Sequence, residues 1–335
     1  MGGVNIEPVI DISNYLTIIA LEDGLTATLS GSTVEYCVDG DGNWKSLSSN
    51  TASESINKGH MLSFRGNLTP NSSTGIGRFT ISKSCDLTGN CNSLLFGDNA
   101  VNNNSLSGKS YAFYYLFNNC STIKNVSSNF LPATTLAQGC YFYMFNGCTS
   151  LSTAPQLTAT TLITYCYYMM FCGCKLLTTA PDLPVTTLAQ SCCKSMFKFC
   201  TSLTTAPALP CTTLANHCYD SMFYDCTSLI TAPQLPATTL ADYCYYSMFY
   251  GCKDLTTAPE LPATTLVSNC YYRMFCGCSK LNYIKAMFTT KPSNSYTMYW
   301  VSGVASSGTF VKNKNATWSV TGESGIPSGW TVQTA

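Results

Sequence analysis

Charged side chains are scarce in this chain. Only 10% of its 335 residues are Asp, Glu, Lys or Arg, and the net charge is 0, whereas about 25% charged residues is usual for soluble domains. No basic stripe is present, so the composition predicts no nucleic-acid partner. The polar surface must come from Thr, Ser, Asn and Tyr, which suits hydrogen bonding to neutral, hydroxyl-rich partners.

Long apolar runs are also missing. No stretch of about 18 apolar residues occurs, so we expect no membrane insertion. The segment from Met1 to Pro8 lacks the basic and then apolar regions of a secretory leader. Two alternatives stay open: a leader was removed, or export does not use one.

Histidine is nearly absent, and with it the usual catalytic patterns. Only His60 and His217 occur, and no metalloprotease, P-loop or dinucleotide-binding motif is present. The pairs Cys172–Cys174 and Cys276–Cys278 have zinc-like spacing. However, other copies of the repeat replace the first cysteine, and a closed zinc site needs four ligands. We therefore predict no catalytic residue, no metal site and no cofactor, and expect that the chain is not an enzyme.

What the sequence does have is a 26-residue period. Met-Phe pairs recur at Met144, Met170, Met196, Met222, Met248 and Met274. Cysteines recur with them in pairs eight residues apart, at Cys140/Cys148, Cys166/Cys174, Cys192/Cys200, Cys218/Cys226, Cys244/Cys252 and Cys270/Cys278. Such a period indicates units that bury their apolar faces against their neighbours. We interpret the cysteines as two ladders of packed thiols, although disulfides between coils remain open on geometry.

Within one repeat, the apolar residues have helical spacing. Leu240, Cys244, Met248 and Cys252 are four apart, which is one face of a helix, and the following segment 255–258 is typical of a short strand. The sequence therefore predicts an α/β repeat solenoid, a leucine-rich repeat with one short strand and one short helix in every coil.

This repeat resembles the BspA-like leucine-rich repeat of surface proteins from gut and oral anaerobic bacteria. That unit has the form Phe-x-x-Cys-x-x-Leu-x-x-Ile-x-x-Pro, and here it is Phe249-Tyr-Gly-Cys252-Lys-Asp-Leu255-Thr-Thr-Ala258-Pro259. The match covers about residues 91–290, with Ala in place of Ile and a longer repeat. The resemblance implies extracellular display and attachment to host matrix or cells. Related repeats occur in bacteriophage tail-associated proteins, and the family defines no binding residue that could be carried over.

The repeat does not extend over the whole chain. Residues 1–85 are predicted as a small all-β, sandwich-like domain with strands near 16–21, 25–29, 33–37, 61–65 and 78–82. Asp39, Asp41 and Asn43 partly match a calcium loop, but a plain turn is favoured because Trp44 replaces the required glycine. Residues 86–290 form the predicted solenoid, with degenerate capping repeats over 86–135, and residues 291–335 form a C-terminal β cap that a short hairpin closes.

Candidate binding residues come from comparing the copies with one another. Positions that vary between copies are expected on one helical face, opposite the core. The predicted ligand-binding residues are Phe142, Tyr168, Lys194, Asp220, Tyr246 and Tyr272 in one column, with Tyr165, Tyr243, Tyr224 and Tyr250 beside it. Tyrosine suits adaptable binding surfaces because it combines apolar area with a hydroxyl. Drift of an unused exposed surface also explains the variation, and the strand side with Thr256 and Thr257 is a competing surface.

These observations lead to one function and one alternative. We predict a non-enzymatic adhesion protein, extracellular or on the cell surface, whose partner is a host or bacterial surface protein or glycan. The alternative is a receptor-binding protein of a bacteriophage tail or virion.

Overall fold

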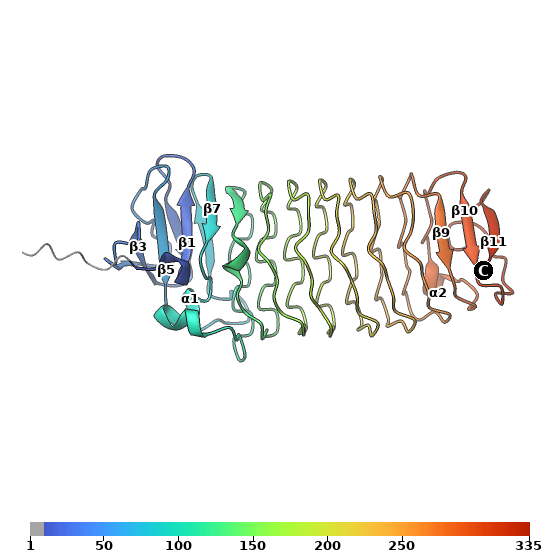
Figure 1. Cartoon of the computed structure of the whole chain (residues 1–335), viewed down its shortest axis with the longest axis horizontal. Coiled ribbons are helices and arrows are strands. Elements are labelled where there is room, and N and C mark those ends of the chain that lie inside the picture. Colours follow the sequence, from blue (N-terminus) through green and yellow to red (C-terminus); the bar gives the residue numbers. More distant parts are fainter. Residues whose placement is uncertain (1–9) are drawn as a thin grey trace, which may run out of the picture.

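The computed structural model describes residues 10–335, which form one elongated body (Figure 1). Strands gather at its two ends, and irregular coils are stacked between them. The strands are β1 (Leu16–Ala20), β2 (Ala27–Ser30), β3 (Val34–Val38), β4 (Lys45–Leu47), β5 (Met61–Arg65), β6 (Arg78–Ile81), β7 (Cys85–Thr88), β8 (Ile123–Val126), β9 (Tyr283–Ala286), β10 (Thr309–Lys312) and β11 (Thr331–Thr334). The helices are α1 (Ser93–Phe96) and α2 (Asn294–Thr297), with 3-10 turns at Ile12–Asn14, Gly97–Asn102 and Ser128–Phe130.

The predicted α/β leucine-rich-repeat solenoid is wrong. Within residues 10–335 the regular structure is mostly sheet, with two α-helices of four residues each. The three sheets do not follow the 26-residue period, and the helix expected in every coil is missing from the segment between β8 and β9. The fold implied by the resemblance to the bacterial repeat is therefore not found.

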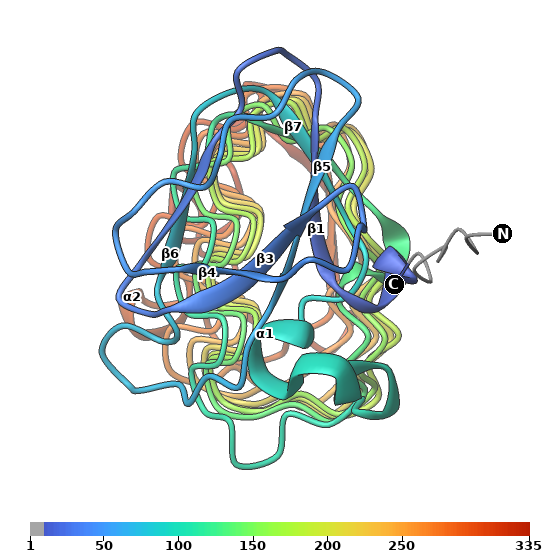
Figure 2. The same ribbon diagram turned by 90° about the vertical axis from the view of Figure 1, so that its left-hand side faces the viewer.

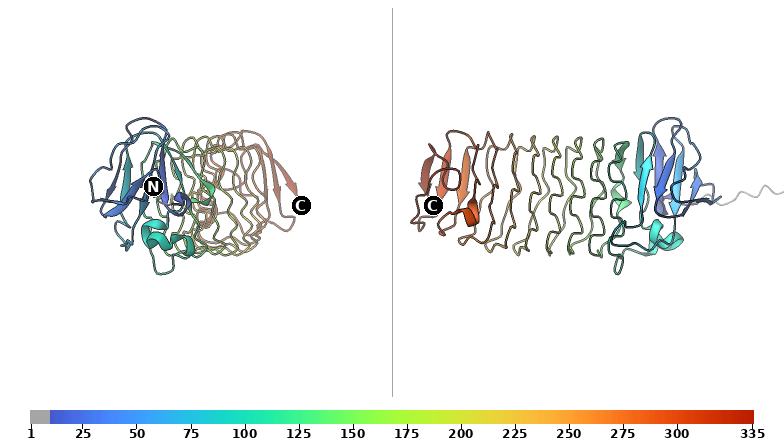
Figure 3. Two further views of the ribbon diagram at one scale, coloured as in Figure 1. Left: turned by 60° about the vertical axis from the view of Figure 1, so that its left-hand side comes forward. Right: turned by 180° about the vertical axis from the view of Figure 1, so that it is seen from behind.

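What recurs every 26 residues is a run of turns. The N–H of Phe142 donates to the carbonyl of Gly139 within the run (3.1 Å), whereas the N–H of Tyr141 donates to the carbonyl of Cys166 in the next coil (3.1 Å). The two kinds of bond alternate along the run, so half of the backbone N–H groups connect neighbouring coils. Figure 3 shows these coils side by side between the two end regions.

A left-handed residue interrupts each run at every fourth position, which explains why the helix prediction failed. In one coil, Tyr243, Ser247 and Gly251 have φ of 58°, 49° and 71°. Each stands directly before one of the buried residues Cys244, Met248 and Cys252. Four-residue turns place every fourth side chain on one side, as a helix does, so the core positions were predicted correctly inside the wrong element.

The core is a set of side-chain columns along the long axis. Phe145 and Phe171 stack with ring centroids 5.7 Å apart and planes 3° apart, and the column continues through Phe197. Met170 and its equivalents are fully buried beside it. Burial of each such side chain contributes roughly 1.5–3 kcal/mol, so coil stacking is stabilised by the same contacts repeated in every coil. Figure 2 shows the coils in projection, one behind another.

The remaining sides of each coil contain threonines instead of the predicted strand. Single parallel bridges join Thr179 to Thr205 and Thr205 to Thr231, without a continuous ladder. The hydroxyl of Thr204 donates to the carbonyl of Thr178 (3.1 Å). A proline follows two residues after each of these three bridging threonines and cannot donate to a sheet ladder, so these bridges stay one residue long.

The N-terminal strands β1, β2, β3, β5 and β6 confirm the five strands predicted there. One sheet has the order β4-β3-β5-β1-β7-β8, and β2 and β6 form a second. Phe64 of β5 and Phe79 of β6 meet edge to face, with centroids 5.1 Å apart, so the two sheets pack against each other. Because β7 pairs with both β1 and β8, the first sheet continues past the predicted boundary at residue 85.

The C-terminal end carries a sheet of β11, β10 and β9. The predicted closing hairpin is wrong, because β10 pairs in parallel with both β11 and β9. Parallel pairing requires a long connection, and the 18 residues between β10 and β11 supply it. Trp300 and Phe288 meet edge to face at 5.8 Å and close the end of the core.

Candidate functional site

The ten predicted binding residues lie on or next to the turn runs, and eight of them are aromatic. We call these eight the aromatic face: Phe142, Tyr165, Tyr168, Tyr224, Tyr243, Tyr246, Tyr250 and Tyr272. All eight are partly buried, because their rings lie along the coils and cover one another. The face therefore has a defined shape before any partner binds.

Its N-terminal part is a cluster around Phe142. The Phe142 ring is 4.5 Å from that of Tyr168 in an edge-to-face arrangement and 6.1 Å from that of Tyr165 in a stacked one. Tyr143 contacts both Phe142 (4.5 Å) and Tyr168 (5.9 Å). Ring pairs of this kind contribute roughly 0.5–1.5 kcal/mol beyond the area they bury, which holds the cluster in one arrangement.

A charged network interrupts the aromatic face at its centre. Asp220 Oδ2 accepts from both Lys194 Nζ (2.9 Å) and His217 Nδ1 (2.9 Å), and Ser221 Oγ donates to Oδ1 (2.7 Å). The Asp220 side chain is only 4% exposed, whereas those of Lys194 and His217 are 28% exposed. A buried carboxylate needs such partners, so Asp220 holds the network together and is not itself open to a ligand.

The C-terminal part consists of stacked tyrosines. Tyr246 and Tyr272 are parallel within 5°, with centroids 4.5 Å apart, and Tyr243 lies 5.8 Å from Tyr246. His217 stacks on Tyr243 at 4.4 Å, which joins this group to the charged network. Tyr224 and Tyr250 form another stack at 4.4 Å, with Lys198 Nζ 4.1 Å above the Tyr224 ring.

Two tyrosine hydroxyls of this face, those of Tyr224 and Tyr246, remain protonated well above neutral pH. Burial, together with the neighbouring Tyr272 hydroxyl, raises the pKa of Tyr246 to about 12. Burial and the neighbouring Tyr250 raise the pKa of Tyr224 to about 12. Each hydroxyl is therefore both a donor and an acceptor of hydrogen bonds at physiological pH.

Comparison of the copies missed part of the aromatic surface. Tyr115 stacks on Tyr143 at 4.8 Å, and Tyr114 lies 5.1 Å from Phe142. Both belong to the first, irregular coil, whose residues precede their equivalents in the next coil by 28 positions instead of 26. The run Tyr114-Tyr115 in front of Leu116-Phe117 was the available signal.

The competing threonine surface is exposed to solvent. Thr178, Thr179, Thr204, Thr205, Thr256 and Thr257 are all exposed. Their side chains vary little from coil to coil, and the Thr204 hydroxyl bonds to backbone of the preceding coil. This surface is regular and polar, in contrast to the varied aromatic face.

The polar clusters around Asp220 and Asp39 do not pair a nucleophile with a base. Ser221 Oγ donates to Asp220 and not to His217, so the order of a Ser-His-Asp triad is absent from this network. Asp39 Oδ2 contacts His60 Nδ1 (2.6 Å), and Asp41 Oδ1 accepts from the N–H of Asn43 (2.9 Å). Over residues 10–335, no group of three or more His, Cys, Asp or Glu side chains is placed to hold a metal ion.

In the same part of the chain, no helix has the length and apolar character that a membrane span requires. Comparison with known proteins gave no match to a family model, a curated protein or a solved structure. The resemblance to the bacterial surface repeat therefore stays a prediction from the motif.

Proposed function

We propose that this chain is a non-enzymatic binding protein of the cell surface, which recognises a protein or a glycan through its aromatic face. The observation that carries the proposal is the pre-ordered tyrosine surface, whose side chains differ from coil to coil while the core beneath them repeats. The contact between Lys194 and the buried Asp220 holds the centre of this surface in place. A partner would therefore meet groups that have already lost their conformational freedom, which lowers the cost of binding.

The stacking also limits how a partner can bind. Tyr246 and Tyr272 cover each other's ring faces, so a partner meets ring edges and hydroxyls. Ring edges carry partial positive charge, and hydroxyls donate and accept. An extended partner with closely spaced carbonyl or hydroxyl groups, such as a polypeptide or a glycan chain, has the matching chemistry.

The test is binding of the labelled protein to a broad glycan array, to epithelial cells and to gut-type bacterial cells. A variant with Tyr168, Tyr246 and Tyr272 changed to Ser removes three rings from the aromatic face. The matched control changes Thr179, Thr205 and Thr257 to Ala on the exposed threonine surface. We expect the tyrosine variant to lose binding and the threonine variant to keep it.

Two results would contradict the proposal. Binding that survives in the tyrosine variant and disappears in the threonine variant would place recognition on the threonine surface. No binding of the parent protein to any of these targets would remove the adhesion function. Thermal melting of both variants checks that each remains folded before its binding is interpreted.

A further inference from the structure

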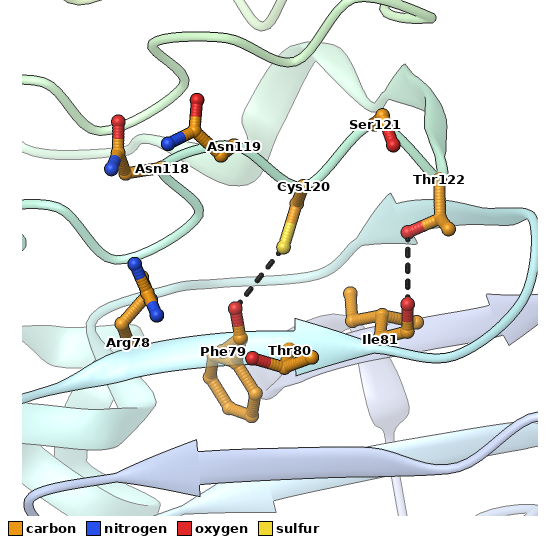
Figure 4. A pocket seen from close by; sticks show the side chains of 9 residues that line it. All are labelled: Arg78, Phe79, Thr80, Ile81, Asn118, Asn119, Cys120, Ser121 and Thr122. Atoms are coloured by element: carbon orange, nitrogen blue, oxygen red, sulfur yellow. Dashed lines mark hydrogen bonds between the residues drawn. The ribbon is translucent and has the colours of Figure 1, made fainter.

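Two adjoining cavities lie where the N-terminal strands meet the first coil. The larger has a volume of about 550 Å³, and its lining includes Ser30, Ser73, Thr74, Arg78, Tyr115 and Asn118. The smaller has a volume of about 260 Å³ and lies between β6 and residues 118–122 (Figure 4). Arg78 and Asn118 line both cavities, so these two side chains stand at the boundary between them.

The smaller cavity exists because β6 does not form a full ladder with the first coil. The N–H of Phe79 donates to the carbonyl of Leu116 (2.7 Å). After that, side chains replace the ladder: Cys120 Sγ donates to the carbonyl of Phe79 (3.1 Å), and Thr122 Oγ1 donates to that of Ile81 (3.2 Å). These longer connections keep the two segments apart and leave room between them.

The side chains at the shared boundary offer hydrogen-bond donors. Arg78 is exposed, and within residues 10–335 its guanidinium makes no ion pair. No carboxylate lines either cavity. Asn118 Oδ1 already accepts from Asn146 Nδ2 (2.7 Å), so the Asn118 amide has its two N–H groups left to donate. A guanidinium and an amide that both donate match the two oxygens of a carboxylate.

The rest of the larger cavity has the opposite character. Ser73 Oγ donates to Asn71 Oδ1 (2.9 Å), whereas Thr74 Oγ1 both donates to that oxygen (3.0 Å) and accepts from Asn71 Nδ2 (2.8 Å). The Ser73 oxygen is therefore left to accept from a ligand. Tyr115, one of whose ring faces is covered by Tyr143, supplies an apolar wall. A ligand that fits has a carboxylate at one end, hydroxyl groups at the other and an apolar ring face between them.

We propose that this double cavity binds a sugar acid, with the carboxylate on Arg78 and Asn118 and the sugar ring against Tyr115. A sugar hydroxyl donates to Ser73 Oγ. No residue of the aromatic face lines either cavity, so this proposal does not depend on the proposed function. It assigns a separate site for the acidic residue of a glycan or for a free sugar acid.

The test is calorimetric titration of the full chain with glucuronate, galacturonate and N-acetylneuraminate, beside glucose, galactose and acetate. We expect at least one of the acids to bind about tenfold more tightly than the neutral sugars and acetate, because only the acids meet both ends of the cavity. Arg78→Gln should weaken the binding of that acid by about tenfold or more, because the substitution removes the charge-assisted pair between the guanidinium and the carboxylate. Lys83→Gln, which removes an exposed charge outside the cavities, should leave the affinity for the acid unchanged.

A second variant keeps the test informative if Arg78→Gln alters folding. Asn118→Asp places a carboxylate at the boundary and should abolish binding of the acid. Changing Tyr168, Tyr246 and Tyr272 to Ser should leave it intact, which separates this site from the aromatic face. The proposal is overturned if no acid binds, if acetate or the neutral sugars bind as tightly as the acids, or if the two cavity variants bind like the parent.

Discussion

At the residue scale, one cysteine thiol makes the same hydrogen bond in each regular coil. Cys148 Sγ donates to the carbonyl of Phe117 (3.2 Å), and Cys278 Sγ donates to that of Phe249 (3.0 Å). The carbonyl of Phe117 also accepts a hydrogen bond from the N–H of Cys120 (3.0 Å). The Cys148 thiol is therefore the second donor to this carbonyl oxygen. Cysteine suits this position because it is small, tolerates burial and carries a weak donor.

Burial also makes these thiols unreactive. All twenty cysteines are unpaired in the structure, and only Cys276 is not buried. Burial raises the pKa of Cys140 from 9.0 to about 12 and that of Cys120 from 9.0 to about 11. Because the thiolate is the reactive form, we expect iodoacetamide at mildly alkaline pH to label Cys276 alone in the native protein and all twenty cysteines in denaturant, as counted by mass spectrometry.

The Cys276→Ser variant is the control for this labelling, since it should show no fast native reaction. If few cysteines were labelled in denaturant without a reductant, the ladders would contain disulfides and the thiol interpretation would fall. If many reacted in the native state, the coils would open far more readily than their packing indicates.

At the element scale, replacing a glycine by alanine should have opposite effects on the free energy of unfolding in a left-handed turn and in a helix. Gly173 has φ of 75°, and the nearest atoms to an added Cβ are those of Gly147 at 3.7 Å, so Gly173→Ala meets strain without crowding. We expect it to lower the free energy of unfolding by about 1–2 kcal/mol. In a helix the same change would raise it by about 1 kcal/mol. Urea denaturation decides the sign.

Gly173→Asn is the matched variant, because asparagine tolerates left-handed backbone. Asn119 holds the equivalent position of the first coil with φ of 60°. We expect Asn to cost less than Ala at residue 173. A stabilising Gly173→Ala would instead favour the helix that the spacing of four predicted.

The element scale is also where sequence reasoning was least successful. Hydrophobic spacing identified Cys244, Met248 and Cys252 as core, because a period of four does so in either element. It could not distinguish a helix from a series of turns. The distinguishing signal is the glycine before the second cysteine of a pair, at Gly147 and Gly251, which a helix would place inside its last turn.

At the scale of the whole molecule, the residues of the aromatic face could be grouped from the sequence because they repeat in the regular coils. Features of the irregular first coil could not be found in this way. Equal spacing placed Tyr246 and Tyr272 in one column, and their rings stack on each other. Tyr115 and the cavity at Arg78 depend on how the N-terminal strands meet the first coil. That junction occurs once, so no comparison between copies could reveal it.

Whole-molecule stability should fall steeply in alkaline solution. Below about pH 9 the thiols are protonated in both the folded and the unfolded chain, so they contribute no pH dependence. Above it, the unfolded thiols release protons while Cys140, with its pKa raised to about 12 by burial, keeps its proton. Rising pH therefore favours unfolding, by up to about 4 kcal/mol for this one thiol at pH 12. The other thiols whose pKa is raised by burial, such as Cys120, act in the same direction.

Urea denaturation measured from neutral pH to about pH 10.5 would show this loss. The free energy of unfolding should first stay constant and then fall with pH, with a slope that corresponds to several protons released on unfolding. The Cys140→Ala variant isolates one thiol, since its slope should be smaller by up to about 1.4 kcal/mol per pH unit. Lysine titration cannot imitate that difference, because both proteins carry the same lysines. A parent protein whose stability stays constant over this range would show that the thiols are solvated or already oxidised, and that the columns of cysteine are not the buried ladders that join the coils.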